Sequence, residues 1–188
     1  MSGPAPVPLI PMPDWLAGLQ AELSGAGGGT LGDIEVLQGI ANAINPRAGT
    51  VNCGWNIDAA IARFTGADPN ATSTTDMDGT WSEIEQRHNT TFTWGSNFQA
   101  AFNAVQAGGP GTAAIVGIGY SGGGAHVVAM VNQNGTVAII EGQDWGNEDP
   151  REVISDPARA DERYNSDGGS SIGWGLVGAG APAPPATP

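Results

Sequence analysis

Apolar residues recur at helical spacing in several parts of the chain. The clearest set falls at positions i, i+3, i+4 and i+7 and consists of Ile57, Ala60, Ile61 and Phe64. Gly66 follows this set and is the type of residue that commonly ends a helix. Segments 14–23, 33–43 and 99–105 also have amphipathic patterns, and a glycine-rich linker lies over 25–29. We therefore expect a helix at each of these apolar patterns.

Two apolar runs rich in β-branched residues predict strands. They cover 127–131 and 136–140, and the polar loop between them ends in Asn134-Gly135, a pair typical of β-hairpin turns. The segment around Trp174 is expected to add a last strand that closes the sheet. The chain thus combines helices with an antiparallel hairpin, which indicates the α+β class.

The hairpin brings polar side chains together at its open end. Its loop allows two registers. In one, His126 stands directly across from Glu141; in the other, the Asn-Gly pair forms a two-residue turn, so that His126 faces Gln143 and has Glu141 on the diagonal. In both registers these three side chains share one face, while Asp144 points to the opposite face.

Cys53 is the only cysteine of the chain, and it immediately precedes the clearest helical pattern. Unpaired amides at a helix N-terminus carry partial positive charge, which favours the thiolate and can lower a cysteine pKa from about 8.5 towards neutrality. The amides of Cys53 and Gly54, helped by Asn52 or Gln143, could also bind an oxyanion. The ordinary alternative is a small apolar side chain that fills a gap in the core.

A cysteine nucleophile needs a histidine, and the chain has two. His88 lies in a charged stretch that is expected to end a helix, where a solvated or C-capping histidine is the ordinary interpretation. His126 has a carboxylate within reach across the hairpin, because Cβ atoms of cross-strand neighbours approach to about 5 Å. Cys53, His126 and Glu141 therefore form the candidate triad, with Asp144 as the alternative acid if the strand is irregular.

Five short segments between residues 40 and 146 carry a resemblance to a known family. They are Ile44-Asn45-Pro46, Asn52-Cys53, Arg63-Phe64-Thr65-Gly66, Gly124-Ala125-His126-Val127-Val128 and Ile140-Glu141-Gly142-Gln143. These segments resemble the papain-fold toxin domains of bacterial polymorphic toxins, which are related to the deamidase domains of pathogen effectors. The spacing between the histidine and the acid also fits that family. Ala125 and Glu141 depart from the glycine and aspartate that the family usually has at these positions.

The resemblance implies a papain-like fold, in which a nucleophile at a helix N-terminus packs on a small antiparallel sheet that carries the histidine and the acid. It implies a toxin or effector hydrolase that deamidates a glutamine of a protein in a target cell. We expect neither a cofactor nor a metal, because one cysteine and two separated histidines cannot make a structural zinc site without carboxylates. A cognate immunity protein is a further candidate partner. The walls of the cleft are expected to come from segments 68–80 and 90–97.

Three other functions remain open. The first is a cysteine protease of the same fold, and the second is a CHAP-like peptidoglycan amidase, which also uses Cys, His and Glu in this order. The third is an inactive binding module, in which Cys53 would be unreactive. Residues 119–123 match the serine-hydrolase pattern G-x-S-x-G, but that fold requires a later histidine, so we expect a glycine-rich loop that carries His126 to the cleft.

Composition limits the class of partner. The 188 residues suit one domain, which we place at 30–178, after a Pro/Gly-rich segment with a short helix at 1–29 and before a disordered Ala/Pro tail at 179–188. A net charge of −13 argues against nucleic acids and anionic membranes. It is compatible with a basic protein partner, but solubility alone is the ordinary interpretation of such a charge. The chain has neither a run of 18 apolar residues nor a secretory signal. We expect delivery by a dedicated secretion system and activity in a recipient cytosol.

Overall fold

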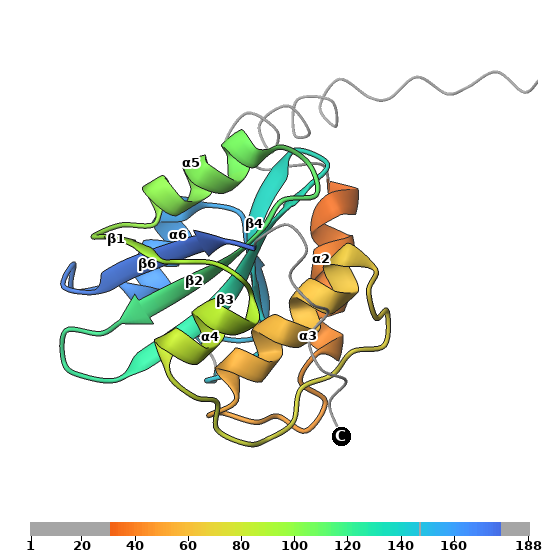
Figure 1. Ribbon diagram of the computed structural model, residues 1–188, viewed down its shortest axis with the longest axis horizontal. Helices are drawn as coiled ribbons and strands as arrows, with labels where there is room; N and C mark the ends of the chain where they lie inside the picture. The colour runs from red at the N-terminus through yellow and green to blue at the C-terminus, as the bar shows by residue number, and fades with distance from the viewer. Residues whose placement is uncertain (1–30, 147, 178–188) are drawn as a thin grey trace, which may run out of the picture.

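A six-stranded antiparallel sheet forms the centre of the protein, and its strand order is β1-β6-β2-β3-β4-β5 (Figure 1). The computed structural model describes residues 31–146 and 148–177. The strands are β1 (Thr93–Gly95), β2 (Ala113–Gly119), β3 (Ala125–Gln133), β4 (Thr136–Glu141), β5 (Glu152–Ile154) and β6 (Ser171–Leu176). The helices are α2 (Leu31–Ala43), α3 (Cys53–Thr65), α4 (Trp81–Arg87), α5 (Gln99–Gly108) and α6 (Pro157–Tyr164).

Helices cover both faces of the sheet. On one face, α2, α3 and α4 pack on β2, β3 and β4, and on the other face α5 and α6 cover the same strands (Figure 1). Alternate residues of β3 point into the two cores, as expected for a strand buried on both sides: Val127 and Val131 face α3, whereas Val128 and Met130 face α5. The sheet and helices confirm the α+β class.

The predicted helices at 33–43 and 99–105 are confirmed as α2 and α5, the helix predicted from the apolar residues at 57–64 is α3, and the predicted last strand is β6. The expected helix at 14–23, the linker at 25–29 and the tail at 179–188 lie outside the described residues. Of the helices that the described ranges contain, none combines the length and the apolar composition that a bilayer crossing requires.

The β3–β4 hairpin adopts the second of the two predicted registers. Gln133 pairs with Thr136 and Ala129 pairs with Ile140, so the turn consists of two residues. Asn134 has a φ of 54° and Gly135 a φ of 98°, the positive values that a tight hairpin turn requires. Continued towards the open end, this register places His126 level with Gln143 and leaves Glu141 on the diagonal.

α3 ends at Gly66, which adopts the left-handed conformation with a φ of 78° and donates its backbone N–H to the Arg63 carbonyl. A Cβ added at this glycine would meet no atom within 4 Å, so only backbone strain opposes a side chain there. We expect Gly66→Ala to lower the free energy of unfolding by about 1 kcal/mol.

Gly39→Ala is the matched control for this prediction. Gly39 lies inside α2, and a Cβ there would also meet no atom within 4 Å. Because alanine is the better helix former, this change should raise the free energy of unfolding by up to about 1 kcal/mol. Urea denaturation of both variants checks the pair. Effects of the same sign would contradict the assigned cap.

Candidate active site

Cys53 is the first residue of α3, and its side chain is half-buried. Its amide and that of Gly54 are therefore among the N–H groups that have no partner inside the helix. Cys53 and His126 line the same cleft, and the interaction with Cys53 is one of the causes that raise the pKa of His126. The structure thus places the only cysteine at a helix N-terminus and in the same cleft as a histidine from β3.

His126 and Glu141 form a buried ion pair. The Nε2 of His126 lies 2.7 Å from Oε2 of Glu141, so Nδ1 is the ring nitrogen that remains for the Cys53 sulfur. The ring of Trp145 packs edge-on against the imidazole, with 4.7 Å between the ring centroids. The sequence therefore predicted which histidine and which acid meet.

The two buried groups shift each other's pKa. Burial by itself lowers the pKa of His126, but the charge of Glu141 and hydrogen bonding of the imidazole to Cys53 and Glu141 outweigh it and raise this pKa to about 9. Burial raises the pKa of Glu141, but the charge and the hydrogen bond of His126, with further help from Arg163 and the Gln143 amide, bring it below its usual value. At neutral pH the pair is an imidazolium and a carboxylate.

Glu141 has three further partners that fix its orientation. The Gln143 backbone N–H donates to Oε1 at 2.8 Å, and the hydroxyl of Tyr164 donates to Oε2 at 2.7 Å. The guanidinium of Arg163 lies 4.0 Å from Oε2. Burial and the charge of Glu141 raise the pKa of Tyr164 well above its ordinary value, so the phenol remains a donor. Tyr164 and Arg163 thus help to hold the carboxylate that holds His126.

Sequence reasoning missed Tyr164 and Arg163 because it did not recognise α6. A signal for this helix was present, since Asp156 caps its N-terminus by accepting the Ala158 N–H at 2.9 Å and Pro157 occupies its first position. That signal would locate the helix. It would not show that the last turn of α6 reaches the end of β4.

Asn52 was expected to help bind the oxyanion, but its side chain is occupied by hydrogen bonds within the protein. Its Nδ2 donates to Asn45 Oδ1 at 3.0 Å and to Ser73 Oγ at 3.1 Å, so both amide hydrogens have acceptors within the protein. Its Oδ1 accepts a hydrogen bond from Gln143 Nε2 at 3.0 Å. Asn52 is fully buried and does not line the cleft. It ties the start of α3 to neighbouring segments.

Of the other residues expected around the nucleophile, two line the cleft and one lies outside it. Gly54 and Gln143 line the cleft beside Cys53. Gln143 Nε2 donates to Asn52, and its Oε1 accepts from the indole N–H of Trp145 at 3.1 Å. Asp144 is exposed, lies outside the cleft and accepts the Gly146 N–H. Asp144 is therefore not the acid that meets His126.

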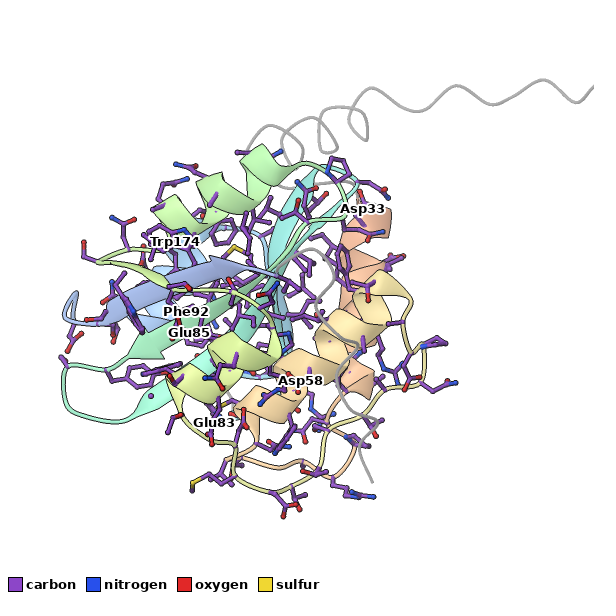
Figure 2. The ribbon with its side chains drawn as sticks, viewed as in Figure 1. Asp33, Asp58, Glu83, Glu85, Phe92 and Trp174 are labelled. Atoms are coloured by element: carbon purple, nitrogen blue, oxygen red, sulfur yellow. The ribbon has the colours of Figure 1, made fainter. Side chains whose placement is uncertain are left out.

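His88 was expected to be either a C-capping or a solvated histidine. It is the C-cap of α4, and it is buried. Its Nε2 lies 2.5 Å from Oδ1 of Asp58, an acidic residue of α3 where that helix runs beside α4 (Figure 2). Arg87 pairs with the other oxygen of Asp58 at 2.7 Å and with Asp78 at 3.0 Å. These contacts fasten α4 and Asp78 to α3.

The cleft has a volume of about 510 Å³. It is lined by Thr50, Val51, Cys53, Gly54, Met77, Asp78, Gly79, Thr80, Trp81, Ile84, Tyr120, Ala125, His126, Val127, Gln143 and Trp145. Segment 68–80 contributes a wall through its last four residues, as expected, whereas segment 90–97 does not line the cleft and forms β1 instead. Within the described ranges, His, Cys, Asp and Glu form no group of three suited to a metal ion.

Comparison with known proteins identifies the family. The family model described as "Papain fold toxin 1, glutamine deamidase" matches residues 51–145, which is half of the chain. The chain therefore belongs to this family of papain-fold toxin hydrolases. No curated protein and no solved structure matched. The matched region begins two residues before Cys53 and includes His126 and Glu141.

Proposed function

We propose that the protein is a cysteine-dependent hydrolase that converts glutamine side chains of a target-cell protein to glutamate. One observation carries the proposal: Cys53, at the N-terminus of α3, shares a cleft with a histidine that is itself held by a buried carboxylate. The family description supplies the reaction class, since it names glutamine deamidation. A protein that only retained the fold would have no need of the ion pair beside its cysteine.

The chemistry begins with the nucleophile. The pKa of His126 near 9 means that this residue holds a proton at neutral pH, which stabilises Cys53 as a thiolate beside it. The thiolate attacks the carbonyl carbon of the glutamine carboxamide and forms a tetrahedral intermediate. The backbone N–H groups of Cys53 and Gly54, with the Gln143 carboxamide on the same cleft wall, stabilise its oxyanion.

Collapse of this intermediate breaks the C–N bond. His126 donates its proton to the departing nitrogen, which leaves as ammonia, and an acyl thioester remains on Cys53. The neutral imidazole then takes a proton from water, and the resulting hydroxide attacks the thioester carbonyl. Glutamate is released, and the thiolate and imidazolium are regenerated. Throughout the cycle Glu141 keeps the imidazole oriented, and Tyr164 and Gln143 keep Glu141 in place.

The proposal is tested by producing the protein and its Cys53→Ala variant in recipient cells and comparing the cellular proteins by mass spectrometry. The expected result is conversion of specific glutamines to glutamate with the wild-type protein and none with the variant. Cut peptide bonds in place of deamidated side chains would identify a protease of the same fold. Release of peptidoglycan fragments alone would identify a cell-wall amidase. Identical protein samples would leave only a binding role, the outcome least compatible with the site.

A further inference from the structure

Large apolar side chains are exposed at the mouth of the cleft. Val51, Met77 and Trp145 are 48%, 74% and 40% exposed, and all three line the cleft that contains Cys53 and His126. They are half of the strongly exposed large hydrophobic residues in the described part of the chain. We call these three residues the apolar rim. Exposed apolar residues that gather around a functional site mark a surface that becomes covered on binding.

The apolar rim is built from three separate segments. Val51 precedes α3, Met77 precedes α4, and Trp145 follows β4. Trp145 is held in place, because its indole N–H donates to Gln143 and its ring packs against His126 and lies 5.1 Å from the Arg163 guanidinium. Met77 is unbranched and can adapt to ligands of different shape. The rim thus joins a fixed aromatic side to an adaptable aliphatic side.

Charges around the cleft favour a ligand that is not acidic. Among the described residues that line the cleft, Asp78 and His126 are charged in addition to the Cys53 thiolate, and none is an arginine. Exposed carboxylates of Asp76 and Asp144 adjoin Met77 and Trp145 in sequence. The chain as a whole has a net charge of −13. A ligand with acidic residues beside its reactive group would meet like charge, whereas basic residues further out would be attracted.

We infer that the enzyme selects glutamines that have a large apolar neighbour in the substrate and basic residues beyond it. The apolar neighbour seats on the rim of Val51, Met77 and Trp145 while the carboxamide reaches Cys53. This inference rests on the proposed function and adds the chemical class of the segment that is recognised. It accounts for apolar residues that the catalytic steps themselves do not use.

A pair of peptide probes tests the inference. Both are acetylated pentapeptides with arginine at each end and a central residue whose side chain carries a diazoketone in place of the glutamine carboxamide. The residues that flank this centre are leucine in one probe and serine in the other. The diazo carbon takes the proton of the His126 imidazolium, the Cys53 thiolate then displaces nitrogen gas from this carbon and forms a thioether, and the labelled protein is detected by intact mass. The second-order rate of labelling is measured for each probe.

We expect the leucine probe to label the wild-type protein about tenfold faster than the serine probe, because its side chains gain contact with the apolar rim. In a Val51→Ser, Met77→Ser double variant this preference should shrink to about twofold or less. Val36→Ser is the matched control, since Val36 is 54% exposed but lies on α2 away from the cleft. That variant should retain the full preference.

Two other outcomes count against the inference in different ways. Equal labelling of wild-type protein by the two probes would overturn the role of the rim and leave the proposed deamidase intact. If iodoacetamide alkylates Cys53 but neither probe does, recognition of a glutamine side chain fails, and the proposed function falls together with the inference. A preference that persists in the rim variant would also overturn the assignment of Val51 and Met77.

Discussion

His126→Ala is expected to lower the rate of ammonia release from a glutamine substrate by about a thousandfold or more. The variant loses the proton that stabilises the Cys53 thiolate and the acid that protonates the departing ammonia. The rate of Cys53 alkylation by iodoacetamide, followed from about pH 5 to about pH 9, measures the first loss directly. At the acidic end the wild-type protein should react at least about tenfold faster than the variant.

The second histidine supplies the control for this measurement. His88 is buried against Asp58 and does not line the cleft. His88→Gln keeps a side-chain donor at this position and should leave the pH profile of alkylation unchanged. If His126→Ala and the wild-type protein have the same profile, Cys53 is a packing residue and the catalytic proposal is wrong.

Glu141→Leu is expected to have the largest effect on stability. The change removes the carboxylate that pairs with His126 and accepts hydrogen bonds from Tyr164 and the Gln143 amide. Breaking a buried pair in this way typically costs about 3–5 kcal/mol, because the partner charge stays buried without compensation. Activity should fall with it, since the imidazole loses the group that orients it. Urea denaturation and ammonia release measure the two effects.

Tyr164→Phe is the milder companion of this variant. It removes one donor to Glu141 and leaves the carboxylate and His126 in place, so we expect a cost of about 1–2 kcal/mol and a folded enzyme with reduced activity. A Tyr164→Phe variant as unstable as Glu141→Leu would show that the hydroxyl, and not the ion pair, supplies most of the stabilisation at this site.

The same ion pair predicts how stability depends on pH. The pKa of His126 is raised to about 9. The contribution of His126 to the stability of the fold is therefore fully present below the ordinary histidine pKa and is lost as pH rises through about 9. The pKa of Glu141 is lowered, so the contribution of Glu141 to the stability of the fold is present above the ordinary glutamate pKa and is lost as pH falls through the lowered value. Between pH 7 and pH 10 the wild-type protein should therefore lose more stability than Glu141→Leu, which lacks the pair.

The features predicted correctly from the sequence depend on local patterns. The apolar spacing before Gly66 located α3, and the Asn134-Gly135 turn restricted the hairpin to registers that place His126 and Glu141 on one face. Both inferences involve residues that are close in sequence or joined by one turn. For that reason the central pair of the site could be predicted before the fold was known.

The features that the sequence did not show depend on contacts between distant segments. Asp58 meets His88 across two helices, and Asn52 meets Ser73 and Gln143, 21 and 91 residues away. No local pattern indicates these partners. The sequence therefore locates Asn52 beside the nucleophile correctly. The oxyanion role expected for it is wrong, because its side-chain hydrogen bonds are made to other parts of the fold.

The contacts of Asp78 link the wall of the cleft to the helix that carries Cys53. Asp78 is held by Arg87, and Arg87 is held by Asp58 on α3. Asp78 also lies so close to Gly54 that a Cβ at this glycine would come within 1.3 Å of its Oδ2. A displacement of α3 would therefore carry the wall with it. Side chains that take no part in the chemistry thus set how far this wall stands from the nucleophile.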